Sequence, residues 1–406
     1  MAEKLTLEIT TMAHGGSGLG RDAGNRVIFV PYTIPGETVE VRVTNDKKRF
    51  ANALPEAVLS PSPDRTEPRC PHFGVCGGCH LQHIDYERQL ELKQKVLIDQ
   101  LARLGGLKNP AVRPVWPNPD RYAGGLDIVL SPLPDGGAGL WSDVRHAVMP
   151  IEICHLVIPE LQELIPDLDI ALPTLRKITL RAGSDGEVLA ALETTDIEPP
   201  EIEVDFPVSL ALVLPDGTAA NLIGDATISR EVKGRVFRIS AGAYFYASPP
   251  AAEAVVDAVL RFAGLDGSQR ILELYSGVGM LTAFLAAKCD ELLAVESNPD
   301  AVADMATNLG DLDNVAVYEA AVEDILPEIG VTPDVVVADP GGDLPDALFA
   351  FLEEHGSRFI SISHDVAGLA RDAKTMLGLG YRMEAVQPID MWPQTYQTLS
   401  VALWLP

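Results

Sequence analysis

The feature that most restricts the fold is a regular alternation of apolar strands and helical patterns between about residues 250 and 340. Apolar runs typical of buried strands stand at residues 270–275, 291–296 and 335–338, and helical patterns separate them. Strands that alternate with helices predict a parallel, doubly wound sheet with helices packed on it. We therefore expect a Rossmann-like α/β domain over residues 241–406.

One turn of this domain predicts a ligand. In ILELYSGVGMLTAFLA a buried strand leads through Glu273 into Gly277-x-Gly279, and a helix follows. This layout is typical of a cofactor bound at the carboxyl edge of the sheet, and the lack of G-x-G-x-x-G disfavours a dinucleotide. The next strand ends at Glu296, where a carboxylate can accept both hydroxyls of a ribose. Together these features indicate S-adenosylmethionine, and another nucleoside ligand or a plain turn are the alternatives.

The N-terminal segment has a different pattern. Residues 4–60 alternate apolar and polar positions in short runs between Gly- and Pro-rich turns, which predicts a small antiparallel β-barrel. Lys47, Lys48 and Arg49 precede Phe50, a combination of cations and an aromatic ring that suits phosphate contact and base stacking. A solvated hairpin tip explains the same short run of charges.

Charge is unevenly distributed along the chain. The formal net charge is -27, which argues against binding of nucleic acid over the whole surface. Residues 1–115 carry 15 Lys and Arg against 13 Asp and Glu, whereas the other 291 residues carry 16 against 45. We expect the N-terminal part to approach a phosphate backbone.

Size and composition bound the class of protein. With 406 residues, of which 47% are hydrophobic and 22% charged, the chain can fold into two or three globular domains. Its first residues, MAEKLTLEIT, lack the apolar core of a signal peptide, and no apolar stretch reaches the roughly 18 residues that span a membrane. We expect a cytoplasmic location and no membrane partner.

Three cysteines stand close together after the barrel, at residues 70–79, and a segment with β-type patterns follows at residues 107–240. Cys70, Cys76 and Cys79 form a C-x5-C-x2-C pattern, and Cys154 is a fourth candidate ligand. Three thiolates at this spacing can hold an iron-sulfur cluster that a distant fourth completes. Reduced core cysteines are one alternative. Zinc is another, since several histidines stand nearby: His72, His80 and His83.

The whole chain resembles the RNA uracil-C5-methyltransferase family, whose members make 5-methyluridine in ribosomal or transfer RNA. The resemblance rests on HGGSGLGR and VPYTIPGETVEVRV, on CPHFGVCGGCHLQHIDYERQLELKQ, on LYSGVG and on LARDAKTMLGLGYRMEAVQPIDMWPQT. It implies a TRAM-type, OB-like RNA-binding barrel over residues 1–60, a central cluster-binding domain over 61–240 and a methyltransferase domain over 241–406. The partner implied is RNA, either rRNA or tRNA, and not DNA. Protein partners remain open.

The resemblance also assigns roles to residues. Cys70, Cys76, Cys79 and Cys154 would bind a four-iron four-sulfur cluster with a structural role. The residues expected to contact S-adenosylmethionine are Tyr275, Glu296, Glu323 and Asp339.

The chain departs from the family where the chemistry occurs. Methylation at C5 of uracil needs a nucleophile that adds to C6 and a base that later removes the C5 proton. The family's cysteine in Ser-Cys-Asn-Pro is replaced here by His364, and its glutamate before Ser-Val-Ala-Leu is replaced by Leu399. An imidazole is a poor substitute for a thiolate that must attack carbon and leave again, and leucine accepts no proton.

Three further departures lie in the same region. The family's Asp-Pro-Pro-Arg reads Asp339-Pro340-Gly341-Gly342, which removes an arginine. Its polar stretch after a tyrosine reads 123–125, Ala-Gly-Gly, and its Phe-Phe-Gln reads 244–246, Tyr-Phe-Tyr, which removes a glutamine contact to the cofactor. Asp339 before a proline is also explained as a simple strand terminator.

The sequence leaves several functions open, including whether the protein is an enzyme. The first hypothesis is an RNA methyltransferase-family protein without 5-methyluridine chemistry, either a non-catalytic RNA-binding iron-sulfur protein or an enzyme that methylates another RNA atom. His364 with Asp365 or Asp339 could then serve as a general base, or it is a hydrogen-bonded strand-end histidine. An active C5-methyltransferase that uses Cys289, which reads as a small core residue, and a structural protein without ligands are the other hypotheses.

Overall fold

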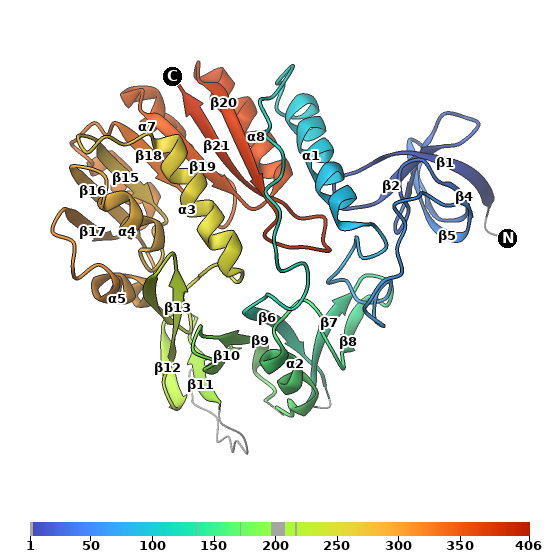
Figure 1. Cartoon of the computed structure of the whole chain (residues 1–406), viewed down its shortest axis with the longest axis horizontal. Coiled ribbons are helices and arrows are strands. Elements are labelled where there is room, and N and C mark those ends of the chain that lie inside the picture. Colours follow the sequence, from blue (N-terminus) through green and yellow to red (C-terminus); the bar gives the residue numbers. More distant parts are fainter. Residues whose placement is uncertain (1–2, 135, 171, 196–207, 216) are drawn as a thin grey trace.

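The structure is a computed structural model that describes residues 3–134, 136–170, 172–195, 208–215 and 217–406. Figure 1 shows a barrel near the N-terminus (blue), a β-rich body (green) and an α/β body (yellow to red) that ends at the C-terminus. The long helix α1 (Tyr86–Arg103) lies between the barrel and the α/β body.

The barrel is closed and has the strand order β1-β2-β3-β5-β4. Alternate side chains such as Ile9, Ile28, Val39 and Val41 fill its interior and are fully buried. Burial of each such side chain stabilises the fold by about 1.5–3 kcal/mol. The predicted barrel is confirmed, but it is not purely antiparallel, because β3 and β5 pair in parallel. Its strands are β1 (Lys4–Met12), β2 (Gly18–Arg21), β3 (Val27–Val30), β4 (Thr38–Asp46) and β5 (Phe50–Ser60).

The β-rich body is a seven-stranded sheet with the order β12-β11-β10-β9-β6-β7-β8, beside a separate β13-β14 hairpin. The helix α2 (Pro159–Leu164) packs against β9, and η1 (Ile165–Asp167) follows it. The strands are β6 (Asp127–Pro132), β7 (Ala138–Ser142), β8 (Ala147–Pro150), β9 (Leu175–Ala182), β10 (Val188–Thr194), β11 (Ser209–Val213), β12 (Ala219–Ile223), β13 (Thr227–Val232) and β14 (Arg235–Ser240).

The α/β body contains a second seven-stranded sheet, with the order β17-β16-β15-β18-β19-β21-β20. The first five strands in this order are parallel, and β21 is antiparallel to both of its neighbours. The predicted doubly wound sheet is confirmed. Its strands are β15 (Arg270–Leu274), β16 (Glu291–Glu296), β17 (Val315–Glu319), β18 (Val335–Ala338), β19 (Arg358–Ser363), β20 (Arg382–Ile389) and β21 (Leu399–Leu405).

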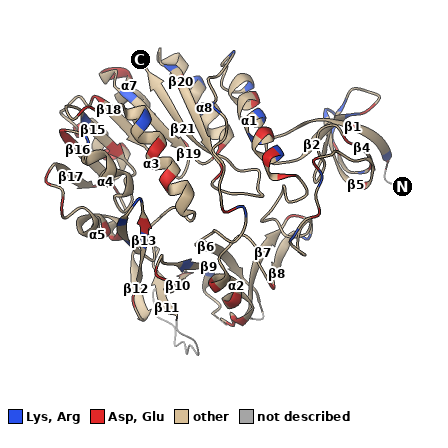
Figure 2. Cartoon of the chain, in the orientation of Figure 1, with Lys and Arg blue, Asp and Glu red and all other residues tan. Residues whose placement is uncertain are grey.

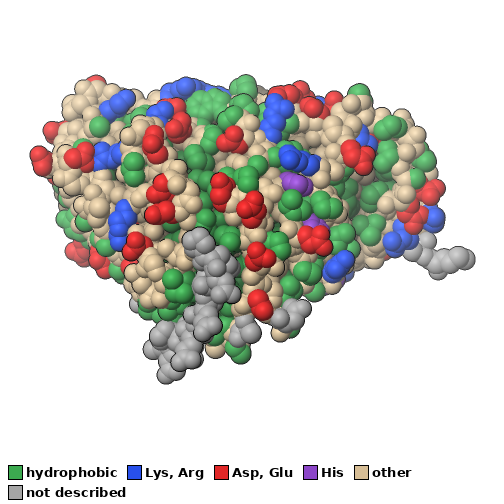
Figure 3. Space-filling view, turned by 60° about the horizontal axis from the view of Figure 1, so that its bottom comes forward, with side chains coloured by type: hydrophobic (Ala, Val, Ile, Leu, Met, Phe, Trp, Pro, Cys, Tyr) green, Lys and Arg blue, Asp and Glu red, His purple; other side chains and the backbone are tan. Residues whose placement is uncertain are grey.

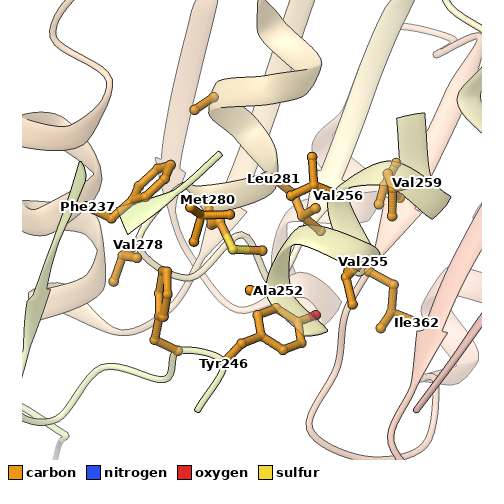
Figure 4. Close-up of a cluster of buried hydrophobic side chains, with 14 of the residues drawn as sticks. Phe237, Tyr246, Ala252, Val255, Val256, Val259, Val278, Met280, Leu281 and Ile362 are labelled. Atoms are coloured by element: carbon orange, nitrogen blue, oxygen red, sulfur yellow. The ribbon is translucent and has the colours of Figure 1, made fainter. Parts of the chain in front are cut away.

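Helices cover this sheet because each presents an apolar stripe. Figure 4 shows side chains of α3, of the turn after β15 and of Tyr246 gathered in one buried cluster, which continues into β19 through Ile362. The helices are α3 (Pro249–Ala263), α4 (Met280–Ala286), α5 (Pro299–Asn308), α6 (Val322–Ile325), η2 (Leu326–Glu328), α7 (Asp346–His355) and α8 (Val366–Gly378).

The segment between the cysteines and the β-rich body is joined to the α/β body. Leu97 and Leu101 of α1 are buried in the same core as Leu369 and Ala373 of α8. After α1, Val112 and Trp116 form parallel bridges with Val386 and Ile389, so this linker runs along the outer edge of β20.

The domain division at residues 60 and 240 stays a prediction. Within the described residues, none of the helices is long and apolar enough to cross a membrane.

Candidate active site

The turn after β15 has a backbone that few residues adopt. Tyr275 has φ 60°, in the left-handed region that non-glycine residues rarely occupy, and Gly277 (φ 56°) and Gly279 (φ 86°) follow it. A Cβ at Gly279 would lie 2.8 Å from Cγ of Met305 in α5. The turn therefore requires glycine at position 279, where the conformation and the close approach of α5 coincide.

Glu296 fixes this turn from the neighbouring strand. Its Oε2 accepts a hydrogen bond from the backbone amide of Gly277 at 2.8 Å. Its Oε1 accepts from the amides of Ser297 and Asn298 at 2.7 and 2.8 Å. The carboxylate thus lies beside the turn at the carboxyl edge of the sheet, as the sequence predicts for a ribose ligand. Its role as a ligand contact stays a prediction.

A small cavity of about 40 Å³ opens between the ends of β15 and β18, the point where the strand order reverses. Burial raises the pKa of Glu273 to about 8, so this carboxyl group is mostly protonated at neutral pH. The cavity is lined by three of the predicted cofactor-binding residues, Tyr275, Gly277 and Asp339, and by Tyr244, Tyr246 and Glu273.

Glu323 lies near the same turn but on the exposed side. It stands in the first turn of α6. Burial of Tyr275 and, to a smaller extent, the charge of Glu323 raise the pKa of the Tyr275 hydroxyl to about 12. The phenol of Tyr275 therefore stays protonated and can donate a hydrogen bond. Contact of Glu323 with a cofactor stays a prediction.

His364, directly after β19, is hydrogen-bonded to Asp339, directly after β18. Nε2 of His364 lies 2.9 Å from Oδ1 of Asp339, and the hydroxyl of Tyr246 donates to Oδ2 of the same carboxylate. Of the two partners considered from the sequence, Asp339 is therefore the one that His364 contacts. Asp365 instead caps α8, where it accepts from the amides of Ala367 and Gly368.

Aromatic rings surround His364. The imidazole stacks on Tyr246 with centroids 6.2 Å apart and meets Tyr244 edge-on at 5.9 Å. Trp392, from the loop after β20, approaches it at 5.8 Å. A flat ligand that enters beside His364 therefore meets aromatic side chains on more than one side.

Leu399 lies at the same edge of the sheet. It is the first residue of β21, and the next residue, Ser400, pairs with Ser363 of β19. The Leu399 side chain is fully buried in the apolar core. The structure thus brings the two substituted positions, 364 and 399, to one corner of the site, and the second offers no group that can accept a proton.

The loop after Asp339 leaves space. A Cβ placed on Gly341 or Gly342 would meet no atom within 4 Å. By contrast, a Cβ on Gly124 would lie 2.3 Å from Cβ of Asp120, and one on Gly125 3.0 Å from the carbonyl oxygen of Leu156. Packing explains the glycines at 124 and 125, whereas no close contact requires those at 341 and 342.

All four predicted cysteine ligands line one larger cavity of about 390 Å³. This cavity extends from Cys70, Cys76, Cys79 and Cys154 to Trp392. Among the described residues, no three His, Cys, Asp or Glu side chains come close enough together to hold a metal ion.

The cysteines are half-buried, and backbone amides point at two of the sulfurs. The amide of Gly78 donates to Sγ of Cys76 at 3.4 Å, and amides of Leu156 and Val157 interact with Cys154. Burial and the three neighbouring cysteines raise the pKa of the Cys79 thiol to about 12.

The basic residues of the barrel form the tip of the β4–β5 hairpin. Lys47, Lys48 and Arg49 are exposed, and Phe50 packs edge-on against Phe29 at 5.9 Å. Figure 2 shows basic residues (blue) on the barrel, both basic and acidic residues on α1 and α3, and acidic residues (red) on α2. On the face drawn in Figure 3, basic side chains are scattered among acidic and hydrophobic ones.

Sequence reasoning missed the network that holds the Trp392 loop. Lys93 of α1 is fully buried, and its Nζ donates to Oδ1 of Asp390 at 2.5 Å and to the carbonyl oxygen of Trp392 at 3.0 Å. The hydroxyl of Tyr86 donates to the other Asp390 oxygen at 2.7 Å. The signal in the sequence is Lys93 itself, which stands in the apolar stripe of the helix and so needs a buried partner for its charge.

A second missed network supports the tyrosine segment. Nη1 of the buried Arg181 donates to the carbonyl oxygen of Ala243 at 2.7 Å. Arg230, which is also buried, donates to the carbonyl oxygen of Tyr246 at 3.2 Å, and Asp127 pairs with both guanidinium groups. These contacts fix the backbone on both sides of the aromatic rings that face His364.

Comparison with known proteins agrees with this architecture. Residues 2–54 match the model of the TRAM domain. The chain is 31% identical to a protein of Streptomyces avermitilis named an uncharacterized RNA methyltransferase, over 100% of this chain and 99% of that protein. A protein of the same description from Halalkalibacterium halodurans is 30% identical over 97% of this chain and 95% of its own length. The chain belongs to this family of RNA methyltransferases.

A solved structure confirms the fold of this RNA methyltransferase. The tRNA (uracil-54, C5)-methyltransferase of Pyrococcus abyssi, in complex with S-adenosyl-L-homocysteine, superposes with a TM-score of 0.71. The match covers 98% of this chain and 100% of that one, at 23% identity. The predicted combination of TRAM barrel, β-rich body and Rossmann-like methyltransferase sheet is thus confirmed as the fold.

Proposed function

We propose that this RNA methyltransferase binds S-adenosylmethionine at the turn after β15 and transfers its methyl group to RNA without the cysteine chemistry of uracil-C5 methylation. The observation that carries the proposal is the combination at one sheet edge of an intact ligand turn with a His364–Asp339 pair where a nucleophilic cysteine is expected. When bound, the cofactor would supply an electrophilic methyl group.

The residues present fit a nucleoside cofactor. The carboxylate of Glu296 now accepts a hydrogen bond from the Gly277 amide. When a ribose binds, its hydroxyls can replace this amide as donors to the carboxylate. The cavity itself is small, and Tyr244, which is 55% exposed, stands at its side. Entry of the cofactor therefore requires the Tyr244 side chain to move towards solvent, whereas Tyr246 stays bonded to Asp339.

The charge distribution and the TRAM match support RNA binding. The exposed residues 47–49 supply cations at a hairpin tip, and Phe50 supplies a ring. Phosphate contacts by Lys and Arg give sequence-independent affinity, while stacking holds unpaired bases. The C5-methyltransferase chemistry of the Pyrococcus protein supports uracil in tRNA as one substrate class, and ribosomal RNA is the other.

Loss of C5 methylation is supported by both substituted positions. Addition at C6 of uracil needs a soft nucleophile, and the later proton removal needs a base. His364 is held by Asp339, and the buried Leu399 offers only methyl groups. Neither residue can perform the step of the residue that it replaces.

We further propose that the four cysteines bind a four-iron four-sulfur cluster. Four half-buried thiols gain from a cation that stabilises their thiolate form. All four cysteines line one cavity of about 390 Å³, which has room for a group larger than a single ion. Amide groups that point at Cys76 and Cys154 suit sulfur ligands of a cluster.

The cluster has a direct test with a matched control. Anaerobically purified protein should be brown, with iron and acid-labile sulfide in a ratio of about one to one. Cys79→Ser should lose this absorbance, whereas Cys289→Ser, which changes the fifth cysteine, should keep it. A colourless wild-type protein that contains zinc contradicts this part of the proposal.

The methyl transfer is tested with S-adenosylmethionine labelled in its methyl group and total RNA from a strain that lacks the gene. Labelled nucleosides other than 5-methyluridine support the proposal, and Glu296→Ala should reduce their formation. Labelled 5-methyluridine overturns the loss of C5 chemistry. RNA binding without any transfer supports the non-catalytic RNA-binding alternative.

A further inference from the structure

One ring nitrogen of His364 has a hydrogen-bond partner, and the other has none among the described residues. Nε2 is bonded to Oδ1 of Asp339, and among the described residues none of the hydrogen bonds involves Nδ1. The His364 side chain is 21% exposed, so Nδ1 is not sealed in the core. An imidazole with this division of contacts can accept a proton from a bound molecule.

The surroundings fix which nitrogen carries the hydrogen. Burial and the Asp339 carboxylate raise the pKa of Tyr246 well above its usual value, so Tyr246 stays a phenol and donates to Oδ2. Asp339, a carboxylate, therefore accepts at Oδ1 from the N–H at Nε2 of His364. The lone pair of the neutral ring then lies on Nδ1, which is the arrangement of a general base with a carboxylate partner.

The other carboxyl groups near His364 and Asp339 do not compete with Asp339 for the imidazole. Glu273, which lies near Asp339, is mostly protonated at neutral pH and adds little negative charge. Asp365 is occupied with the α8 amides and with His14, whose Nε2 lies 3.3 Å from Oδ1 of Asp365. Asp339 is therefore the carboxylate that acts directly on His364.

His364 also lies between the two cavities. Tyr244, Tyr246 and Asp339 line the small cavity at the ligand turn, and Trp392 lines the large one. His364 contacts all four of these side chains. A flat base that stacks on Trp392 thus lies beside His364, whose partners Tyr246 and Asp339 line the cavity at the ligand turn.

We propose that His364 is the general base of this enzyme and that its methyl acceptor is a hydrogen-bearing nitrogen of a nucleobase. This inference rests on the proposed function. The lone pair of such a nitrogen is delocalised into the base, so the nitrogen becomes a good nucleophile only when its proton leaves. Nitrogens that carry a free lone pair have no need of the base.

The step balances as follows. The acceptor nitrogen forms a bond to the methyl carbon, the carbon–sulfur bond of S-adenosylmethionine breaks, and its electron pair stays on sulfur to give S-adenosylhomocysteine. The proton of the acceptor N–H passes to Nδ1 of His364, and Asp339 stabilises the imidazolium. Solvent then takes the proton from His364, whose side chain is 21% exposed.

The test compares the wild type with His364→Ala and His364→Gln, using methyl-labelled S-adenosylmethionine and total RNA from a strain that lacks the gene. Loss of a general base lowers the rate by about 10²–10⁴-fold. Added imidazole should restore transfer by His364→Ala at least tenfold, because it can occupy the space of the missing ring. His355→Ala, a change of a distant histidine that stacks on Phe351, should keep the wild-type rate and ignore imidazole.

Calorimetric titration with S-adenosylhomocysteine separates folding and cofactor binding from catalysis. Both His364 variants should bind it within about threefold of the wild type.

Labelled product with the methyl group on a nitrogen that carried hydrogen, such as N3 of uracil or N1 of guanine, supports the inference. A product at N7 of guanine or N1 of adenine, an unchanged rate in both variants, or no response to imidazole overturns it while the proposed function stands. A wild-type protein that neither binds S-adenosylhomocysteine nor transfers a methyl group overturns the proposed function, and the inference with it.

Discussion

The ligand turn of the site is held mainly by backbone groups, whereas the side where His364 lies is held by side chains. At the turn, amides of residues 277, 297 and 298 surround one carboxylate, and a glycine lets α5 approach. Around His364, the contacts are Asp339 with Tyr246 and, behind Trp392, Lys93 with Asp390. A side chain can be replaced without moving the chain, so the chemistry on this side can change while the fold and the turn remain.

The largest effect is expected when the buried cation behind Trp392 is removed, which tests whether side chains hold this half of the site. Lys93→Met leaves Asp390 buried without its charge partner, which should cost about 3–5 kcal/mol of unfolding free energy. The measurement is urea unfolding followed by tryptophan fluorescence. Lys93→Met with Asp390→Leu removes both charges and should recover a large part of the loss. A single variant as stable as the wild type contradicts the role given to the pair.

The backbone side is tested at Gly279. Gly279→Ala places a Cβ 2.8 Å from Met305 at φ 86°, which should destabilise the domain by about 2–4 kcal/mol and abolish S-adenosylhomocysteine binding. Unfolding and calorimetric titration measure the two effects. Gly341→Ala, where the Cβ meets open space, should change stability by less than about 0.5 kcal/mol. Equal effects at both glycines would show that the close approach to α5 is unimportant.

The protonated carboxyl group between the two sides predicts a dependence on pH. The folded-state pKa of Glu273 is raised to about 8 from an ordinary value of 4.5, so its protonation stabilises the fold most at low pH. This contribution disappears as the pH rises from about 4.5 through about 8. Between pH 5 and pH 9 the wild type should therefore lose about 4 kcal/mol more stability than Glu273→Gln does. Denaturant unfolding at pH 5, 7 and 9 measures the difference, and parallel curves would rule it out.

The smallest effect on stability is expected at the barrel hairpin. Replacement of Lys47, Lys48 and Arg49 by Gln should leave stability within about 0.5 kcal/mol but reduce the slope of RNA affinity against salt concentration by about 2. Fluorescence anisotropy with labelled RNA at several salt concentrations gives the slope. Lys288→Gln with Lys374→Gln removes exposed charge from the α/β body and should leave it unchanged. An unaltered slope in the hairpin variant would place the phosphate contacts elsewhere.

The sequence predicted the parts of the molecule that depend on local pattern. Alternation with a period of two predicted the barrel, and strand–turn–helix order predicted the sheet and the turn with Gly277 and Glu296. Contacts between distant side chains left no such pattern. Lys93 and Asp390 are 297 positions apart, and nothing near either residue indicates the other.

The pairing of His364 with Asp339 was one of two options, and only the order of strands decided between them. Parallel strands β18 and β19 are neighbours, so their last residues meet at one edge. Asp365 is closer in sequence, but its position at the start of α8 turns its carboxylate towards the helix amides. Backbone direction, which composition does not reveal, therefore decided the site.

The linker bridges along β20 have a practical consequence. Val112 and Trp116 occupy the outer edge of that strand, so the seven-stranded sheet is shielded there by a segment from earlier in the chain. An unshielded strand edge recruits other chains through its free amide and carbonyl groups. A fragment that starts after this linker would leave that edge bare, and self-association of the isolated catalytic half is the outcome to anticipate when it is produced alone.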